Sequence, residues 1–435
     1  MAKKIILSIN AGSSSVKISA YEASSPQTPP KQLAEASISG LTAPPARLSY
    51  ALGGKTIEKG NELQNEGGAP PTQDEAFKQI LKILTSDSDL PEISHAEDIA
   101  IACHRVVHGG SYASPQLITQ FTLHHLDKLT DLAPLHNAPA LKIVRSCIAE
   151  LPKTTNIACF DSQFHVSSIP EHVRTYVIDP DVAGRKGLRK YGFHGISYAF
   201  ITRSVAEFLG KRGKQGGGDA VNIIALHLGS GASACVIKNG KSWDTSMGLT
   251  PVAGLPGATR SGNVDPSLVF HYTSEADKLS PSSTKDLHIS RAEEILNKES
   301  GWKALTGTTN FGEIVSKRDS DERCKLAFDL FIDRICGYIG AYYVSLGGKV
   351  DALVFAGGIG EKSDVLRAAV VEKVSCLGFT LDERANGREM PDAGDVVMDI
   401  SGEGEGNGTH KTLVVRTDEQ FEMARSCAER EELWE

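Results

Sequence analysis

Two segments about half a chain apart share one pattern of apolar and small residues. In the first, an apolar run at residues 5–9 leads into small residues from Asn10 to Ser15, and an alternating run follows at 16–21. In the second, residues 221–228 are apolar, residues 229–233 read Gly-Ser-Gly-Ala-Ser, and residues 234–238 are strand-like. A strand, a turn of small residues and a second strand predict a β-hairpin. Aligning Gly12-Ser13 with Gly229-Ser230 predicts an internal duplication and therefore two similar domains.

The rest of the chain alternates between strand-like and helical stretches, which predicts an α/β fold. Strand character returns at residues 99–107, and helices are expected at 74–94, 196–209, 321–345, 363–376 and 418–432. Pro, Gly and Ser crowd residues 24–73, so we expect a variable, loop-rich insertion with strand-like patches inside it. Residues 211–218 and 274–287 are expected to form surface loops.

Composition and charge narrow the class of protein. A chain of 435 residues predicts two or three domains. The net charge of −8 excludes the global basic field of proteins that bind nucleic acid or acidic membranes. No apolar run of about 18 residues and no signal-peptide pattern occurs, so we expect a cytoplasmic protein without a membrane span. None of the eight cysteines forms a CxxC pair, which predicts free and mostly buried thiols.

Three turns of small residues are candidates for binding phosphate. Gly and Ser let backbone N–H groups approach a phosphate closely, and such turns occur at residues 12–15, 229–232 and 357–360. The last one lies between an apolar run at 352–356 and an expected helix start at 361, and a helix N-terminus favours phosphate. Each turn alone is more often structural, but three in one chain favour a nucleotide site. The chain has no P-loop, protein-kinase or dinucleotide-binding motif.

Single charged residues at strand ends and in Gly-rich loops are candidates for the chemistry. Arg105 ends an apolar strand beside valines, which suits a small carboxylate that carries a methyl group. Asp161 follows the strand-like run at 156–159, and Arg260 lies in a Gly-rich loop, where it could approach a phosphoryl group. For Arg105 the structural alternative is a salt bridge.

Three further polar residues have both a structural and a functional interpretation. Lys17 could reach back to a phosphate or be an exposed strand lysine. His194 lies between an aromatic residue and a glycine, and a lone histidine is usually a packed or surface residue. Glu419 begins an expected helix, where the helix dipole favours an acid.

Nine short motifs occur in order along the chain. They are Asn10-Ala11-Gly12-Ser13-Ser14-Ser15-Val16-Lys17, His104-Arg105-Val106-Val107-His108-Gly109-Gly110, Leu132-Ala133-Pro134-Leu135-His136-Asn137, Phe160-Asp161, Tyr191-Gly192-Phe193-His194-Gly195, His227-Leu228-Gly229, Asp244-Thr245-Ser246-Met247-Gly248, Thr259-Arg260-Ser261-Gly262 and Gly358-Ile359-Gly360-Glu361. The series resembles the acetate kinase family from about residue 5 to 425. The resemblance implies a homodimer of α/β subunits, each with two ribonuclease-H-like (actin-like) domains and a central interdomain cleft. The N-terminal domain would comprise residues 1–162 and 418–435, and the C-terminal, nucleotide-binding domain residues 163–417.

The resemblance also implies direct, reversible transfer of the γ-phosphoryl group of ATP to acetate, and roles for matching residues. Asp161 matches the catalytic acid, and His194 and Arg260 match residues that stabilise the transition state. Acetate would bind Arg105, with its methyl group in a pocket of Val107, Leu135, Phe193 and Pro251. ATP or ADP would contact Lys17, His227, Leu228, Gly229, Ser230, Gly231, Asn310, Phe311, Gly312, Gly358, Ile359, Gly360, Glu361 and Lys362. Asn10 and Glu419 would lie at a Mg²⁺ site, with Mn²⁺ as the alternative metal. Because acetate is already ionised, we expect Asp161 to position a cation or metal-bound water rather than to act as a base.

The chain departs from the family pattern at several positions. Asn310-Phe311-Gly312 stands where Asp-(Phe/Met)-Arg is usual, which removes an arginine contact to the base. Lys362 and Ser230 each replace an asparagine, and Tyr198 replaces a second histidine. Two alternatives to the ATP-dependent enzyme therefore stay open: an acetate kinase that uses phosphate and pyrophosphate, and a non-catalytic ATP-binding clamp like actin or the chaperones.

Overall fold

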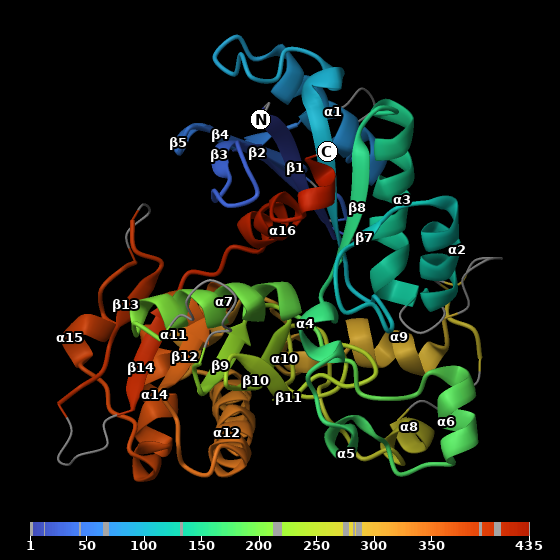
Figure 1. Ribbon diagram of the computed structural model, residues 1–435. Coiled ribbons are helices and arrows are strands. Elements are labelled where there is room, and N and C mark those ends of the chain that lie inside the picture. Colours follow the sequence, from blue (N-terminus) through green and yellow to red (C-terminus); the bar gives the residue numbers. More distant parts are fainter. Residues whose placement is uncertain are drawn as a thin grey trace. The chain divides into compact units, whose positions relative to one another are not determined.

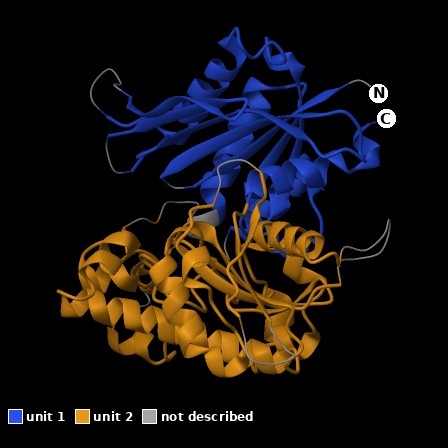
Figure 2. Ribbon diagram, turned by 90° about the vertical axis from the view of Figure 1, so that its left-hand side faces the viewer, with its two compact units in different colours: residues 1–163, 418–435 blue, residues 164–417 orange. Residues whose placement is uncertain are grey.

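The chain forms two compact units, each built on one β-sheet. The computed structural model describes residues 3–12, 14–42, 45–63, 69–130, 134–211, 220–272, 278–281, 283, 289–390, 394–403 and 410–434, without the side chains of 134–136. Unit 1 comprises Met1–Gln163 and Asp418–Glu435, and unit 2 comprises Phe164–Thr417 (Figure 2). Helices cover both sheets, so the predicted α/β fold class is confirmed.

Unit 1 contains an eight-stranded sheet in the order β5-β4-β3-β2-β1-β6-β8-β7. Its strands are β1 (Lys4–Ala11), β2 (Ser15–Ala23), β3 (Lys31–Ser39), β4 (Arg47–Leu52), β5 (Lys55–Glu62), β6 (Ile99–Val106), β7 (Gln116–Leu117) and β8 (Thr155–Phe160). β1 to β5 are successive antiparallel neighbours, whereas β1, β6 and β8 run parallel. Parallel strands need crossover connections, which the helices of this unit supply.

Helices lie on both faces of this sheet (Figure 1), and the side chains of β1 alternate between the two faces. Ile5, Leu7 and Ile9 belong to a core with α1 (Gln73–Ser86) and α3 (Pro134–Glu150). On the opposite face, the hydroxyl of Ser8 donates to the carbonyl of Gln420 in α16 (Glu419–Ala428) over 2.7 Å. α2 (Gln120–Leu129) packs against α3.

Unit 2 contains a six-stranded sheet in the order β11-β10-β9-β12-β14-β13. Its strands are β9 (Ile223–Leu228), β10 (Ala232–Lys238), β11 (Lys241–Thr245), β12 (Ala352–Ala356), β13 (Val397–Asp399) and β14 (Lys411–Val415). The series β11-β10-β9-β12-β14 repeats the series β3-β2-β1-β6-β8, with an antiparallel half followed by a parallel half. The two aligned hairpins thus occupy the same place in both sheets, as predicted.

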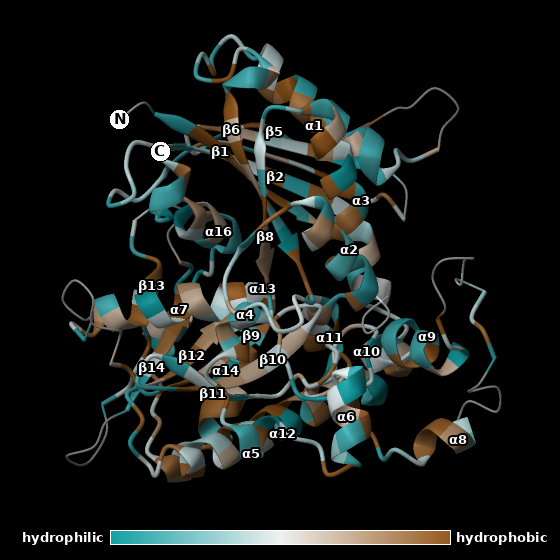
Figure 3. Ribbon diagram, turned by 45° about the vertical axis from the view of Figure 1, so that its right-hand side comes forward, coloured by the Kyte–Doolittle hydropathy of each residue, from teal (hydrophilic) through white to brown (hydrophobic). Residues whose placement is uncertain are grey.

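The sheet of unit 2 also has a helix on each face. Even-numbered residues of β9, such as Leu226, pack in a core with the long helix α12 (Glu322–Ser345). Odd-numbered His227 faces α7 (Gly195–Phe208), where it meets Ser197. Strands β6 and β12, which lie inside their sheets, are predominantly hydrophobic (Figure 3).

Shorter elements complete the two units. They are η1 (Ala96–Asp98), α4 (Gln163–Val166), α5 (Glu171–Arg174), α6 (Pro180–Lys186), α8 (Leu268–Tyr272), α9 (Arg291–Lys298), α10 (Gly301–Thr306), α11 (Phe311–Lys317), α13 (Gly357–Lys362), α14 (Asp364–Lys373), η2 (Ser375–Leu377), α15 (Glu383–Asn386) and η3 (Glu431–Leu433). Within the described ranges, no helix combines the length and the apolar character needed to cross a membrane. The eight cysteines are free thiols, and Cys376 alone among them is exposed.

Three local expectations need correction. The strand-like patches expected within residues 24–73 are β3, β4 and β5, which extend the sheet of unit 1, so the segment is part of the sheet rather than a loop-rich insertion. The helix expected at 74–94 ends at Ser86, and the helix expected from residue 361 begins at Gly357. The surface loops expected at 211–218 and 274–287 fall mostly outside the described residues.

Candidate active site

Polar side chains of unit 1 meet at the carboxyl ends of β1, β6 and β8. These strands are parallel neighbours, so their ends lie at one edge of the sheet. Asn10 is at the end of β1, Arg105 is at the end of β6, and Asp161 follows β8 directly. Asp418 caps the N-terminus of α16, which brings Glu419 to the same edge.

Arg105 is the centre of this cluster. Its Nε and Nη2 atoms donate to the two carboxylate oxygens of Asp161 over 3.0 and 2.6 Å. Such a two-point contact fixes the plane of the guanidinium. Nη1 donates to the amide oxygen of Asn10 over 3.3 Å, and Nε lies 3.7 Å from the carboxylate of Glu419. Arg105 is therefore a cation oriented by three different elements.

The surroundings of Arg105 keep it charged. Burial alone would lower the pKa of the guanidinium, but the charges of Asp161 and Glu419 outweigh burial and raise the pKa. The Asp161 side chain is 1% exposed and that of Arg105 is 20% exposed. Both carboxylate oxygens of Asp161 bond to Arg105, which agrees with a positioning role for Asp161 better than with proton transfer.

The other unit 1 candidates differ in their contacts. Lys17 pairs with Glu35 on the neighbouring strand over 3.0 Å, and its side chain is 41% exposed. Among the described residues no three His, Cys, Asp or Glu side chains are grouped so as to hold a metal ion. Asn10 and Glu419 nevertheless bring an amide oxygen and a carboxylate to one cation, Arg105.

The residues expected to form the methyl pocket are divided between the two units. Val107 is half-buried in unit 1, and the side chain of Leu135 lies outside the described part of the chain. Phe193 and Pro251 are buried in unit 2.

His194 lies at the start of α7 in unit 2 and is held from two sides. Its backbone is left-handed, with φ 57°, which is uncommon outside glycine. Its Nδ1 atom and the hydroxyl oxygen of Ser233 on β10 are 2.9 Å apart. Its ring stacks on that of His227, with centroids 4.2 Å apart. Tyr198, one turn along α7, places its hydroxyl 2.6 Å from the same Ser233 oxygen.

A chain of hydrogen bonds links His227 to the glycine turn after β12. Ser197 lies 2.8 Å from Nδ1 of His227 and 2.8 Å from the hydroxyl of Thr417. The backbone N–H groups of Thr417 and Gly357 donate to one carboxylate oxygen of Glu361 over 3.3 and 3.1 Å. Burial raises the pKa of Glu361, although these two bonds oppose the effect.

Glycines make room for Arg260. A Cβ atom on Gly231 would lie 2.0 Å from the Arg260 guanidinium, so another residue at position 231 would displace that side chain. The loop around Arg260 closes on itself, because the N–H of Gly257 donates to the carbonyl of Arg260 over 3.0 Å. The turn after β9 and the Gly-rich loop thus meet in unit 2.

A pocket of about 480 Å³ in unit 2 is lined by more than half of the residues expected to contact ATP or ADP. It is lined by Gly229, Ser230, Thr309, Asn310, Phe311, Gly312, Val315, Gly358, Ile359, Lys362, Ser363 and Asp364. The Asn310 side chain caps α11 by accepting from two backbone N–H groups, and Phe311 is buried in the core. Their main contribution to the pocket is therefore structural.

Sequence reasoning missed several residues of these clusters. Three of them hold the two histidines and Glu361 in place: Ser197, Ser233 and Thr417. Four others line the pocket: Thr309, Val315, Ser363 and Asp364. A serine three residues after the motif histidine His194 and the alternation of β10 were available signals. The partners themselves depend on which strands are neighbours.

Solved structures define the class of protein. The chain matches a propionate kinase from Francisella tularensis with a TM-score of 0.80 and 30% identity, covering 97% of this chain and 98% of that one. It matches an acetate kinase from Porphyromonas gingivalis with a TM-score of 0.77 and 32% identity, with the same coverage. The fold is therefore the one that acetate and propionate kinases share.

Sequence relatives then identify the family. A probable acetate kinase from Neurospora crassa is 60% identical over 455 aligned residues, which cover 99% of this chain and 95% of the relative. One from Emericella nidulans is 55% identical and covers 98% of each chain. The model of the acetokinase family matches residues 5–425. The chain belongs to the acetokinase family, a family of kinases, and the resemblance found in its motifs is confirmed.

Proposed function

We propose that the protein catalyses the reversible transfer of the γ-phosphoryl group of ATP to acetate, which gives acetyl phosphate and ADP. The observation that carries this proposal is the two-point contact between Arg105 and Asp161. It holds a guanidinium in one plane, and the apolar Val107 follows two residues later in the chain, which suits a carboxylate with one methyl group. The names of the relatives support the same substrate.

The difficulty of this reaction is electrostatic. Acetate is already a carboxylate, so no base is needed, but two anions must meet while charge spreads over the phosphoryl oxygens. Arg105 would orient the attacking oxygen, and Arg260 and His194 would stabilise the transferring group. The reaction requires that acetate bound to unit 1 meets the phosphoryl group bound to unit 2. We therefore propose that the two units are ribonuclease-H-like domains that close over the nucleotide.

The pocket of about 480 Å³ supports a nucleoside as the carrier of the phosphoryl group, because its volume suits a base and ribose. Val315 and Ile359 provide apolar walls for a base. An enzyme that uses only phosphate and pyrophosphate would not need this pocket. The arginine expected near the base is absent at Gly312, so we expect weaker discrimination between bases than the family pattern implies.

A magnesium ion fits the oxygen donors of unit 1. Asn10 and Glu419 would hold it, because Mg²⁺ is usually bound by one or two carboxylates together with substrate phosphates and water. When bound, the ion neutralises charge on the phosphates, and Mn²⁺ could replace it. The residues of the chain would orient the two substrates around it.

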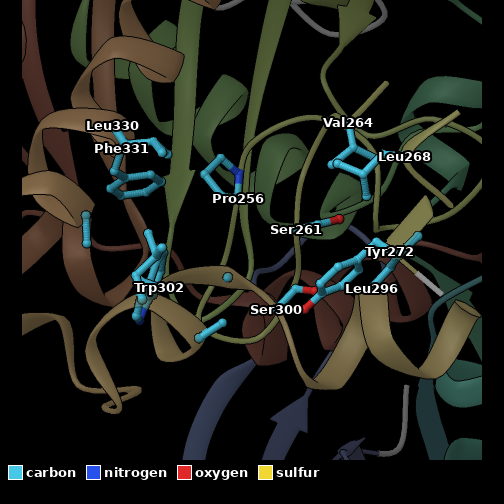
Figure 4. A pocket seen from close by; sticks show the side chains of 14 residues that line it. Pro256, Ser261, Val264, Leu268, Tyr272, Leu296, Ser300, Trp302, Leu330 and Phe331 are labelled. Carbon is cyan, nitrogen blue, oxygen red and sulfur yellow. The ribbon is translucent and has the colours of Figure 1, made fainter. Parts of the chain in front are cut away.

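We also propose a cytoplasmic homodimer. The free thiols support a reducing compartment. Leu268, Phe270 and Tyr272 of α8 are large apolar side chains that are 37%, 75% and 58% exposed. Leu268 and Tyr272 line an apolar groove of about 270 Å³ together with Trp302 (Figure 4). Such an exposed apolar patch favours burial against another protein surface.

The dimer proposal can be tested by light scattering coupled to gel filtration. We expect a mass of two chains for the wild type and of one chain for Phe270→Asp, because a charge would be costly in an apolar interface. Val177→Asp, which changes an apolar side chain exposed elsewhere in unit 2, serves as the control and should leave the dimer intact. A wild type that elutes as one chain would refute the proposal.

The reaction itself can be tested by trapping acetyl phosphate as its hydroxamate. We expect product from acetate with MgATP, and consumption of acetyl phosphate with ADP but not with phosphate alone. Efficiency should fall from acetate to propionate to butyrate, because each methylene must find room. Arg260→Ala should lower kcat about 10³-fold, as for other transition-state arginines.

Each contrary result of this assay has a definite meaning. Turnover with phosphate and not with ADP would identify the pyrophosphate-linked enzyme. Binding of ATP without turnover of acetate would identify a nucleotide clamp. Equal use of butyrate would contradict the small methyl pocket.

A further inference from the structure

Ser233 forms the middle of a buried hydrogen-bonded triad with His194 and Tyr198. Its hydroxyl oxygen lies 2.9 Å from Nδ1 of His194 and 2.6 Å from the hydroxyl of Tyr198. Ser233 and Tyr198 have no exposed surface, and His194 is 9% exposed. We propose that Tyr198 and Ser233 are positioning residues that hold His194 as the neutral tautomer with its proton on Nε2. This inference rests on the proposed function, in which His194 contacts the transferring phosphoryl group.

The backbone holds the three side chains together. Tyr198 is four residues after His194, and its N–H donates to the carbonyl of His194 over 2.9 Å, so both side chains lie on one face of the first turn of α7. Ser233 pairs with His227 across β9 and β10, which puts both side chains on the α7 face of the sheet. The His194 ring is therefore stacked on one member of that strand pair and hydrogen-bonded to the other.

The direction of the hydrogen bonds follows from the number of protons available. Each buried hydroxyl has one proton to donate, and leaving a buried donor unsatisfied is costly. If Tyr198 donates to Ser233, then Ser233 can donate to Nδ1 of His194, and both hydroxyl protons are used. If instead Nδ1 carried the proton, it would donate to Ser233, and one of the two hydroxyl protons would have no acceptor within the triad.

This direction fixes what His194 can do. With Nδ1 as an acceptor, the ring proton is on Nε2, so His194 acts as an oriented hydrogen-bond donor without first becoming a cation. A preorganised donor stabilises charge that develops in a transition state and contributes little to ground-state binding. Tyr198 stands where the family pattern has a histidine, and in this chain its phenol hydroxyl contacts Ser233.

The test is a double-mutant cycle with a spectroscopic measurement. Tyr198→Phe removes only the hydroxyl, and Ser233 can then rotate to accept from Nδ1. We expect kcat to fall about 10-fold with the KM values for acetate and ATP within about twofold, since removing a whole oxyanion donor costs about 100-fold or more. Because Tyr198 acts through His194, the same substitution should have no further effect in a His194→Ala background.

Three other variants separate positioning from a loss of packing. Tyr342→Phe is the matched control, because Tyr342 is also buried in unit 2 and its hydroxyl has no hydrogen-bond partner among the described residues. It should leave kcat unchanged. Ser233→Ala should reproduce the effect of Tyr198→Phe, and Ser233→Thr, which keeps the hydroxyl, should restore most of the activity.

The tautomer can be observed without any turnover. In a long-range ¹H–¹⁵N spectrum of the histidine rings, with His194 assigned from His194→Gln, we expect a protonated Nε2 in the wild type and a mixture of tautomers in Tyr198→Phe. An unchanged tautomer, an effect that persists in His194→Ala, or a fall in activity matched by Tyr342→Phe would each overturn the inference. If the wild type does not phosphorylate acetate, the proposed function fails, while the spectrum still decides whether the triad sets the tautomer.

Discussion

Arg105 shows how a half-buried charge paired with a buried one can serve both folding and binding. Two of its nitrogens face Asp161, and a third faces Asn10. A buried ion pair adds little net stability compared with apolar packing, but removing one partner leaves the other charge uncompensated. The pair is therefore better explained by the orientation that it gives to the guanidinium than by stability.

Replacing Arg105 should affect binding and stability together. We expect Arg105→Ala to raise the KM for acetate about 100-fold, since hydrogen bonds to charged groups contribute up to about 3 kcal/mol. It should also lower the free energy of unfolding by about 3 kcal/mol, because Asp161 is left buried without its cation. Arg105→Lys keeps the positive charge but cannot make the two-point contact of a guanidinium. Its KM for acetate should therefore lie between those of the wild type and Arg105→Ala. Steady-state kinetics and urea unfolding measure the two effects.

Arg47→Ala provides the matched control for Arg105. Arg47 pairs with Glu62 over 3.0 Å in the same sheet, but the two side chains are 51% and 56% exposed. An exposed pair contributes less than about 1 kcal/mol, so stability should change little and the KM for acetate should not change. An unchanged acetate KM in Arg105→Ala would remove Arg105 from the acetate site.

At this scale, the sequence indicates which residues carry chemistry but not with which residues they pair. Asn10, Arg105 and Asp161 each end or follow a strand, so their convergence could be predicted for parallel neighbours. The contact of both Asp161 oxygens with Arg105 could not be predicted, because it depends on β6 and β8 being adjacent. For Lys17, the pairing with Glu35 depends in the same way on β3 extending the sheet.

At the scale of elements, periodicity was the reliable signal, and composition misled. Residues 24–73 look loop-rich because they contain many turn residues, yet the segments between those turns alternate as strands do. In β4, Leu48 and Tyr50 are buried while Ser49 between them is not. Gly53 and Gly54 have φ values of 54° and 80°, which suit the tight two-residue turn between β4 and β5.

The early start of α13 has a different physical cause. Gly357 has φ 75°, and a Cβ atom there would approach the backbone of Leu228 to 2.8 Å. The chain can therefore turn directly from β12 into a helix, close against β9, only with glycine at this position. The run of glycines signalled a turn, but the close approach of β9 depends on the tertiary structure.

At the scale of the whole molecule, each unit has a core of its own and a buried neutral histidine. In unit 1, His104 lies 2.8 Å from the side-chain oxygen of Asn156. In unit 2, the two ring nitrogens of His165 lie 2.7 Å from the hydroxyl of Ser242 and 3.0 Å from the carbonyl of Phe193. Phe193 directly precedes His194 in the chain. Burial lowers the pKa of each histidine from 6.5 to about 4. A lower pH should therefore reduce the free energy of unfolding of both units.

The direction in which pH changes the folding stability depends on whether the unfolded or the folded chain binds protons at the higher pH. As the pH falls below 6.5, the unfolded chain protonates these histidines while the folded units do not, down to about pH 4. Their stabilising contribution is thus complete above pH 6.5 and is lost between pH 6.5 and about 4. Fully expressed, each shift corresponds to about 3 kcal/mol. Glu361 and Asp418, whose pKa values burial raises, act in the opposite direction, so the comparison must be made between variants.

Glutamine can keep the hydrogen bonds of either histidine but does not titrate, so it should remove the pH dependence from one unit at a time. Between about pH 7 and about pH 4.5, His104→Gln should make the loss of stability smaller in unit 1, and His165→Gln should do so in unit 2. Urea unfolding followed by peptide-resolved hydrogen exchange measures the two units separately.

His95→Gln, at a side chain that is 78% exposed, is the control and should leave both slopes unchanged. If the histidine variants keep the wild-type slopes, other groups cause the acid sensitivity. If each variant changes both units equally, the two sheets unfold as one cooperative structure.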